Sequence, residues 1–299
     1  MNVQELKKQY DGKTVVDGVS FAIPKGKVTS LIGPNGAGKS TVMGMISRLI
    51  AHDSGVVDFE GRDIGKWKSR ELSRRLAILT QSNSIQMKLT VRELVAFGRF
   101  PYSGNRVTLE DQKIIDRAIS YMELEGFQDR FIDELSGGQR QRAMIAMAMS
   151  SDPKILIADE PTTALDVTIQ AQILHLLLEL QKKNNMSIIL ITHDLGVVAQ
   201  TCKRVAVMCG GYVVEEGTVE EIFLHPGHPY TQALIASMPR VGGTFEQFLE
   251  RDLSDGNGDL CPFLNRCKYA DKTCEACLPK YYEASEGHRI FCHRREEKR

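Results

Sequence analysis

The sequence lacks several features that would narrow its function at once. It has no excess of charge of either sign, because 38 Lys and Arg residues balance 38 Asp and Glu residues among its 299. We therefore do not expect nucleic acid or an anionic membrane surface as its main partner. It also lacks long apolar runs, since stretches such as IILI at 188–191 fall far below the ~18 residues of a membrane-spanning helix.

The first ten residues, MNVQELKKQY, lack the basic and then apolar layout of a secretory signal peptide. We therefore expect a soluble chain that is not exported, and any role at a membrane has to come through a partner. The hydrophobic content of 42% is ordinary for a globular protein, and 299 residues suit one large domain or two modest ones.

Cysteine is scarce in the body of the chain and crowded at its end. Cys202 and Cys209 lie in the main body. Five more fall in the last 39 residues: Cys261, Cys267, Cys274, Cys277 and Cys292. Because a chain without an export signal is expected to stay reduced, this cluster favours a metal site over disulfides.

What the sequence does contain is a phosphate-binding pattern. The stretch KVTSLIGPNGAGKST at 27–41 is an apolar strand that runs into a Gly-rich loop matching G-x-x-x-x-G-K-[ST]. A helix is predicted next, because apolar residues repeat at helical spacing: Val42, Met45, Ile46, Leu49 and Ile50. In this context the loop N–H groups cradle phosphates, Lys39 neutralises the β and γ oxygens, and the Ser40 hydroxyl ligates Mg²⁺. The pattern predicts a nucleoside triphosphate site rather than a chance Gly-rich turn.

A second helix start lies in LSGGQRQR at 135–142. Ser136 and Gln139 have the spacing of a capping box, and apolar residues follow at helical spacing: Met144, Ile145 and Ala148. Two glycines in a first turn weaken a helix, so packing alone does not explain them. They leave bare N–H donors open to an anion, which the helix dipole also favours. We therefore expect this helix N-terminus to meet an anion.

Two further apolar strands end in reactive groups. KILIADEP at 154–161 places Asp159 and Glu160 at a strand end, and SIILITHD at 187–194 does the same for His193. Ligands gather at the carboxyl ends of parallel strands, so both strands can serve one nucleotide. Asp159 fits a Mg²⁺-binding carboxylate, and Glu160 beside it could orient or deprotonate the attacking water. Alone, each would be an ordinary strand end, but the upstream phosphate loop favours catalysis.

Together these motifs resemble the ABC ATPases, the nucleotide-binding subunits of ABC transporters, over residues 1 to about 240. The resemblance implies an α/β P-loop NTPase fold with a RecA-like core, an antiparallel β subdomain and an α-helical subdomain at about 82–150. The ATPase domain would span 1–239.

The resemblance also implies roles for single residues. Tyr10 would stack on adenine, Gln81 is the Q-loop glutamine, and His193 is the switch histidine. Mg²⁺ would be bound by Ser40, Gln81 and Asp159, with Glu160 as the catalytic glutamate. The other ATP-binding positions implied are the Walker A loop at Gly33, Pro34, Asn35, Gly36, Ala37, Gly38, Lys39, Ser40 and Thr41, the signature at Ser136, Gly137, Gly138 and Gln139, and the D-loop Asp166.

In this family two cassettes face head to tail, and the signature of one addresses the γ-phosphate held by the other. A chain with one set of motifs is therefore expected to dimerise with a second ABC ATPase subunit, identical or not, around two ATP molecules. It would hydrolyse ATP to drive uptake through permease subunits at the cytoplasmic face of the membrane, served indirectly by an extracytoplasmic substrate-binding protein.

The alternative is a soluble ABC ATPase of translation or DNA repair. Such proteins typically carry two cassettes or a long coiled coil between their motifs, whereas Lys39 and Ser136 stand only 97 positions apart. The spacing favours the importer.

The likeness within the family is mosaic. Residues up to about 140, with VRELVAFGRFPYSG at 91–104, resemble iron-siderophore importer ATPases. From about 157 onward the chain resembles di- and oligopeptide importer ATPases, with IADEPTTALDVTIQAQIL and HPYTQALIASMP. Because permease subunits mainly meet the helical subdomain, we expect a siderophore-type partner, although the C-terminal tail favours the peptide branch.

Beyond Pro239 the composition changes. Residues 240–260 are polar and rich in Gly and Asp, which predicts a linker, and 261–299 form a Cys-rich tail. The cysteines that match the set at the end of many peptide-importer ATPases are Cys261, Cys267, Cys274 and Cys292, which implies a [4Fe–4S] cluster. Zinc suits four cysteines equally, Cys277 is an alternative ligand, and empty reduced thiols remain open.

Overall fold

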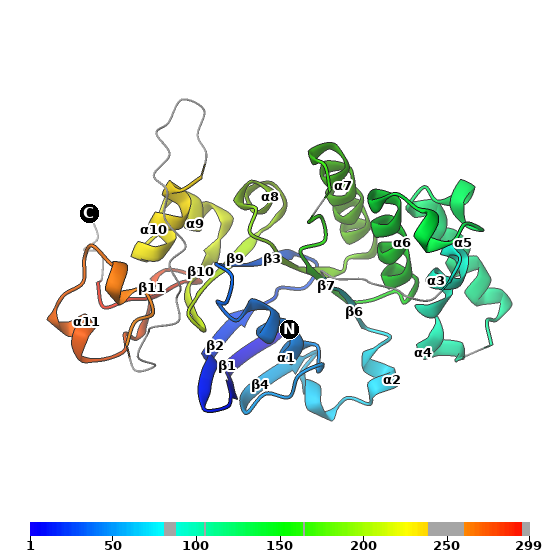
Figure 1. Ribbon diagram of the computed structural model, residues 1–299. Helices are drawn as coiled ribbons and strands as arrows, with labels where there is room; N and C mark the ends of the chain where they lie inside the picture. Colours follow the sequence, from blue (N-terminus) through cyan, green and yellow to red (C-terminus); the bar gives the residue numbers. More distant parts are fainter. Residues whose placement is uncertain (81–87, 105, 164, 239–259, 295–299) are drawn as a thin grey trace. The chain divides into compact units, whose positions relative to one another are not determined.

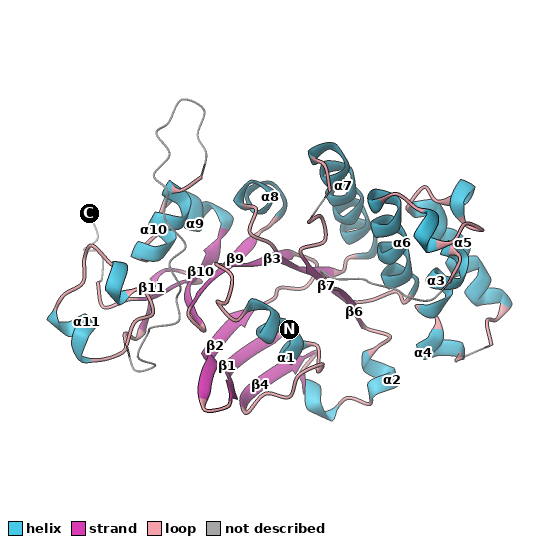
Figure 2. Cartoon of the chain, viewed as in Figure 1, coloured by secondary structure: helices cyan, strands magenta, loops and turns pink. Residues whose placement is uncertain are grey.

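The structure is a computed structural model that describes residues 1–80, 88–104, 106–163, 165–238 and 260–294. These residues fold as two compact units that alternate along the chain. The first unit comprises Met1–Pro24, Val28–Gly65 and Ile191–Arg299, and the second comprises Lys25–Lys27 and Lys66–Leu190. Both combine β-strands with helices, as the α/β prediction requires (Figure 1, Figure 2). Among the described helices, none has the length and apolarity needed to cross a membrane.

The first unit contains an antiparallel sheet built on a hairpin. Its strands follow the order β2-β1-β4-β5, with β1 (Asn2–Tyr10), β2 (Lys13–Ala22), β4 (Ser54–Phe59) and β5 (Arg62–Asp63). Tyr10 pairs with Lys13 across Asp11 and Gly12, whose backbones both have positive φ, 49° and 78°. That geometry, with an Asp-Gly pair, matches the right-handed twist of the flanking strands.

A second group of strands in the first unit carries the phosphate loop. The order is β11-β12-β10-β9-β3, with β3 (Val28–Ile32), β9 (Arg204–Cys209), β10 (Tyr212–Thr218), β11 (Tyr281–Ser285) and β12 (His288–Phe291). β3 is parallel to β9, whereas β10 is antiparallel to both β9 and β12. Every residue of β3 is buried, which explains why this strand reads as a continuous apolar run.

Five α-helices are described in the first unit: α1 (Lys39–Ile46), α8 (Leu195–Thr201), α9 (Val219–Leu224), α10 (Pro229–Ala236) and α11 (Lys272–Ala276). The first is shorter than predicted. Arg48 adopts a left-handed backbone, φ 63°, and the Ile50 N–H returns to the Gly44 carbonyl at 2.9 Å. Leu49 and Ile50 therefore lie beyond the end of α1, so their predicted places on the apolar face of the helix were wrong, and Leu49 is 64% exposed.

The Cys-rich end of the chain is joined to β10 of the first unit. Glu216 lies opposite Arg289 in the β10–β12 pairing, and Glu215 lies opposite Ile290. Glu215 is fully buried and accepts hydrogen bonds from the His228 N–H at 2.9 Å and from the His288 side chain at 2.7 Å. A buried carboxylate requires such partners, and here they come from both α10 and β12. The predicted linker falls almost wholly outside the described residues.

The second unit places three strands in the order β8-β7-β6, with β6 (Leu76–Leu79), β7 (Ile155–Asp159) and β8 (Ser187–Ile191). β6 and β7 are parallel. Its helices are α2 (Ser69–Leu72), α3 (Val91–Phe97), α4 (Phe100–Ser103), α5 (Leu109–Tyr121), α6 (Gly137–Ser150) and α7 (Val167–Asn184). The Met144, Ile145 and Ala148 face predicted for α6 is buried.

A buried ion pair holds the helices of the second unit together. The Arg99 Nε donates to Asp111 at 2.7 Å, and its guanidinium also donates to the Ser150 carbonyl at the end of α6. Burial alone would raise the pKa of Asp111, but hydrogen bonds from Arg99 and Thr108 outweigh it and hold that pKa well below its ordinary value. The sequence reasoning missed this pair, because the spacing of two charged residues does not reveal burial.

Candidate functional site: a phosphate loop and a glycine-rich helix start

The phosphate loop, Gly33–Thr41, links β3 to α1 in the first unit. Lys39 is 8% exposed, and its ammonium donates to the carbonyls of Gly33 at 2.8 Å and Pro34 at 2.9 Å. The loop therefore curls around a buried cation. Gly38 stands at the N-cap of α1, and no side chain caps the helix. A buried cation beside an uncapped helix N-terminus is the chemistry that a phosphate group needs.

Two glycines of this loop are required by close approach of other backbone. A Cβ on Gly33 would lie 2.3 Å from the Met208 carbonyl oxygen, and one on Gly38 would lie 2.9 Å from the Val15 carbonyl oxygen. Both residues also have positive φ, 153° and 95°. The spacing of glycines in the sequence motif therefore has a steric cause in the neighbouring strands.

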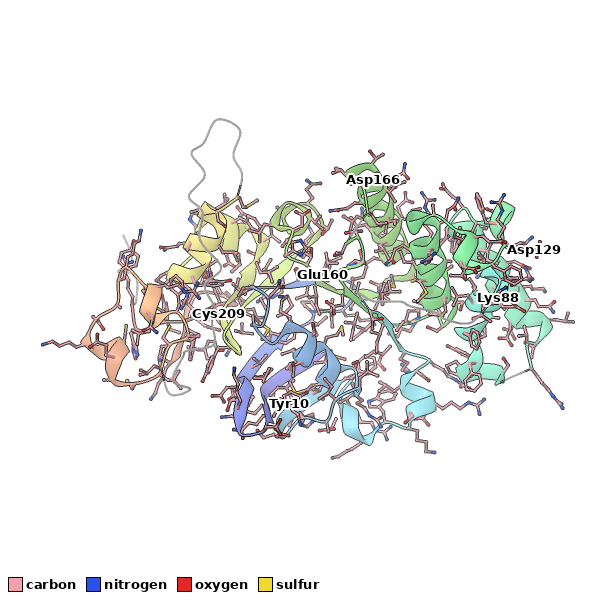
Figure 3. The ribbon with its side chains drawn as sticks, viewed as in Figure 1. Tyr10, Lys88, Asp129, Glu160, Asp166 and Cys209 are labelled. Atoms are coloured by element: carbon pink, nitrogen blue, oxygen red, sulfur yellow. The ribbon has the colours of Figure 1, made fainter. Side chains whose placement is uncertain are left out.

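Tyr10 stands at the end of β1 in the same unit (Figure 3). Its side chain is 43% exposed, and the Lys8 ammonium lies 5.3 Å from the centre of its ring. An exposed ring on a short hairpin can stack on a flat base, as the family resemblance implies for adenine.

The end of β7 carries two acidic residues of the second unit. Asp159, the last residue of the strand, is 7% exposed. Glu160 follows with a left-handed backbone, φ 46°, which is uncommon for a residue with a side chain. Its carboxylate accepts a hydrogen bond from the Thr163 hydroxyl at 2.8 Å.

Asp166 begins α7 a few residues further on, and Figure 3 labels it together with Glu160. Its carboxylate caps the helix by accepting the Ile169 N–H at 2.9 Å. A structural role at the N-cap is therefore visible for a residue that the sequence motif had assigned only to nucleotide binding.

The signature turn, Ser136–Gln139, begins α6 as predicted. The Ser136 hydroxyl accepts the Gln139 N–H at 3.3 Å, and the Gln139 side chain accepts the Ser136 N–H at 3.0 Å, which completes the capping box. Packing explains one glycine after all, because a Cβ on Gly138 would lie 2.8 Å from the Ile169 side chain. On Gly137 it would make only an ordinary contact, 3.5 Å from Leu165.

The signature turn opens on a cavity of about 500 Å³ in the second unit. The lining residues come from the signature turn, the start of α7 and the loop after α5, and include Ser136, Gly137, Gly138, Gln139, Arg142 and Asp166. The Arg142 guanidinium is paired with Glu123 and also donates to Gln172 at 3.1 Å. The nearest cation to this cavity is thus already neutralised. The sequence reasoning did not single out Arg142, although it lies in the same motif.

Three further residues predicted for the ATP site are His193, Ser40 and Gln81. His193 is exposed and lies two residues after β8, next to Asp194, which caps α8 through the Val197 N–H at 3.1 Å. Ser40 is exposed at the start of α1. Gln81 lies outside the described residues.

The cysteines predicted to bind metal lie in the described part of the C-terminal segment. Burial is the largest of the causes that raise the pKa of Cys261 to about 11, and the thiols of Cys292, Cys267 and Cys274 contribute to that rise. Across the described residues, no group of three or more His, Cys, Asp or Glu side chains is arranged to hold a metal ion. Cys277 lies 4.0 Å from a ring nitrogen of His293 instead.

Comparison with known proteins places these features in a family. The family model "ABC transporter" matches residues 16–163, and "Oligopeptide/dipeptide transporter, C-terminal region" matches 214–274. The petrobactin import ATP-binding protein YclP of Bacillus subtilis is 44% identical over 222 residues, 74% of this chain and 88% of that protein. The oligopeptide transport ATP-binding protein OppD of the same organism is 39% identical over 306 residues, 95% of this chain and 84% of that protein.

Solved structures agree. A bacterial ABC transporter cassette solved as a dimer, MJ0796, is 28% identical, with a TM-score of 0.65 over 73% of this chain and 98% of that chain. The phosphate loop, the end of β7 and the start of α6 all lie within the residues that the family model matches. The chain belongs to the ATP-binding subunits of ABC transporters, which hydrolyse ATP to drive transport.

Proposed function

We propose that the phosphate loop holds the triphosphate of ATP and that the end of β7 directs its hydrolysis. The observation that carries this proposal is the burial of Lys39 inside its own loop, beside a helix N-terminus that no side chain caps. On binding, the ammonium exchanges the Gly33 and Pro34 carbonyls for β and γ phosphate oxygens. Those oxygens carry full charge, so the exchange favours the bound state.

By the family resemblance, the residues that would hold Mg²⁺ are Ser40 through its hydroxyl, Asp159 through its carboxylate and Gln81 through its amide oxygen. A hydroxyl, a carboxylate and an amide oxygen are ligands that this hard cation accepts. When bound, Mg²⁺ neutralises charge on the β and γ phosphates. Glu160 orients the attacking water and accepts its proton, while His193 contacts the γ-phosphate and Tyr10 stacks on adenine.

We propose that the signature turn of one chain contacts the γ-phosphate of the ATP held by a second cassette. Its cavity contains backbone donors but its arginine is paired with Glu123, so it is suited to a phosphate already held elsewhere. The cassette solved as a dimer supports this arrangement. Asp166, the predicted D-loop residue, lines the same cavity, and two ATP molecules would be enclosed by the two cassettes.

The relatives named as import ATPases support a role as the energy-coupling subunit of an importer. The protein would sit peripherally at the cytoplasmic face of the membrane, bound to permease subunits, and an extracytoplasmic substrate-binding protein would deliver the cargo. Co-purification tests this role: the permease should be retained with the chain. Stable binding to ribosomes or DNA in its place would contradict the proposal.

We infer that an apolar patch in the second unit docks the permease. Four exposed apolar side chains fall within 97–109: Phe97 (47% exposed), Phe100 (56%), Val107 (43%) and Leu109 (78%). Phe97 ends α3, Phe100 begins α4 and Leu109 begins α5, so these side chains come from consecutive elements of the helical region. The siderophore-like sequence of this region favours a permease for iron-siderophore complexes, whereas the match at 214–274 favours peptides.

A segment replacement and a truncation distinguish a siderophore permease from a peptide permease as the partner. Replacing 82–135 by the equivalent peptide-importer segment should move binding to a peptide permease, whereas removing 240–299 should leave permease choice unchanged. Phe97→Ser with Phe100→Ser should weaken docking, and Leu224→Ser, which alters a 65% exposed side chain in α9, is the matched control. A switch of permease on truncation alone would contradict the siderophore assignment.

We propose that the C-terminal cysteines Cys261, Cys267, Cys274 and Cys292 bind a [4Fe–4S] cluster, with zinc as the alternative. The mutual effect of these thiols on the pKa of Cys261 supports their closeness, and a metal would displace their protons and draw them together. Anaerobically purified protein should be brown. Colourless protein with stoichiometric zinc would identify zinc, and protein with neither metal would contradict both.

A further inference from the structure

The turn between β9 and β10, Cys209–Gly211, lies against the phosphate loop. The Gly211 N–H donates to the Ala37 carbonyl at 3.2 Å, and the Gly211 carbonyl accepts the Asp17 N–H at 3.0 Å. Met208, just before the turn, is the residue that leaves no room for a Cβ on Gly33. The turn therefore forms part of the wall that holds the loop in its curled shape.

The other side of the same turn carries the Cys-rich segment. A Cβ on Gly210 would lie 2.6 Å from the Cβ of Pro262, so these two residues are in direct contact. The Cys261 thiol also lies near this turn: burial is the main cause that raises the pKa of Cys209 to about 12, and the Cys261 thiol contributes to the rise. Figure 3 labels Cys209 at the end of β9.

Pro262 is held in this position by Phe263. The Phe263 ring is 3% exposed and meets the Tyr230 ring edge-on at 5.4 Å and the His228 ring at 6.3 Å. Both partners belong to the start of α10, where Glu215 accepts the His228 N–H. A close-packed chain of contacts thus runs from α10 through Phe263 and Pro262 to the turn.

We propose that Pro262 is a positioning residue for the phosphate loop, so that the position in which the Cys-rich segment packs against Gly210 sets the affinity for ATP. The proposal rests on the assignment of Gly33–Thr41 as the ATP loop. Well-packed interiors transmit displacement rather than absorb it. A shift of Pro262 moves Gly210, Gly211 follows as its neighbour, and the Ala37 carbonyl loses its donor. The loop then binds the triphosphate less tightly, while the acidic residues that perform the chemistry are untouched.

The experiment compares two glycine substitutions in the full-length chain. Gly210→Ala places a methyl group against Pro262, whereas Gly61→Ala places one in open space at a similar backbone angle, φ 77° against 52°. We expect Gly210→Ala to raise the Kd for a fluorescent ATP analogue, and the KM for ATP, roughly three- to tenfold relative to Gly61→Ala. The kcat at saturating ATP should not change. Equal affinities of the two variants would overturn the proposal.

Rescue separates positioning from a simple loss of stability. Pro262→Gly removes the atoms that the new methyl group meets, so Gly210→Ala with Pro262→Gly should bind ATP more tightly than Gly210→Ala alone. Additive losses in the double variant would contradict the contact. Lys39→Ala tests the assignment of Gly33–Thr41 as the ATP loop. If Lys39→Ala binds ATP normally, that assignment fails. If Lys39→Ala loses ATP binding while the Gly210 and Pro262 variants keep normal ATP affinity, only the proposal for Pro262 fails.

Discussion

The two glycine-bearing helix starts, at α1 and at α6, solve different problems with similar residues. At α1 the N-cap is Gly38 in a left-handed conformation, the helix has no side-chain cap, and Lys39 is buried beside it. At α6 the capping box of Ser136 and Gln139 already satisfies part of the first turn, and the turn opens on a wide cavity. The first has its own cation, and the second has Arg142, which Glu123 neutralises.

The difference between the starts of α1 and α6 indicates which of them binds ATP first. A buried cation and uncapped donors can bind a triphosphate within a single chain. A capped turn with a neutralised arginine offers only weak attraction to a free anion, so it contributes once the anion is already held and brought to it. We therefore expect α1 to control ATP binding and α6 to control dimerisation and hydrolysis.

The largest effect is expected at Glu160, the proposed catalytic glutamate. Glu160→Gln preserves the size of the side chain and removes the charge that polarises water, so turnover should fall by about 10²–10⁴-fold. ATP affinity should survive, because the phosphate loop is unchanged. Phosphate release and equilibrium ATP binding measure the two quantities. Hydrolysis at the normal rate would remove Glu160 from the catalytic role.

The next largest effect is expected on stability, when the buried Arg99–Asp111 pair is broken. Arg99→Ala leaves Asp111 buried without its partner, and the free energy of unfolding should fall by about 3–5 kcal/mol in urea denaturation. Arg92→Ala is the control, because its pair with Asp116 is exposed and should contribute about 0–1 kcal/mol.

At acid pH, the difference in the free energy of unfolding between wild type and Arg99→Ala should become smaller. The pKa of Asp111 is lowered in the folded state, so its stabilisation is complete above the unfolded pKa and is lost as pH falls toward the folded one. A stability difference that did not shrink below about pH 4, the ordinary range of this carboxyl, would contradict the assignment.

A smaller loss is expected when the cation of α1 is removed. Lys39→Ala deletes charge-assisted hydrogen bonds worth about 1.5–3 kcal/mol, so ATP should bind roughly 10–100-fold more weakly in titration calorimetry. Lys183→Ala, which removes a lysine stacked over Tyr121, should not alter ATP affinity. If both variants bound ATP like the wild type, the loop would not be the primary site.

The smallest effect distinguishes the cap of α6 from an ordinary cap. Ser136→Ala should cost about 1 kcal/mol of stability, as should Thr90→Ala, which removes the same capping box from α3. Only Ser136→Ala should also reduce ATP-dependent dimerisation and hydrolysis. Equal activity of the two variants would reduce the signature turn to a structural feature.

Sequence reasoning predicted the parts of this comparison that depend on local patterns. The phosphate loop, the capping box of Ser136 and the strand before Asp159 all follow from residues a few positions apart, and the structure has each of them. The end of α1 was missed because Arg48 adopts a left-handed conformation that nothing in its type demands. The Arg99–Asp111 pair and the contact between Gly210 and Pro262 were missed because they join distant positions, and no local spacing encodes burial.

We expect the phosphate loop to bind ATP within one chain and the signature turn to require a second chain. Light scattering coupled to size-exclusion chromatography tests it on Glu160→Gln with ATP and Mg²⁺. At an ATP concentration that saturates Glu160→Gln but lies below the weakened Kd of the variant with Lys39→Ala, we expect Glu160→Gln to have the mass of a dimer with ATP and of a monomer without it. Adding Lys39→Ala should give a monomer in both conditions. A wild-type chain that remained a monomer while hydrolysing ATP at full rate would contradict the account, because the signature turn would then have no phosphate to meet.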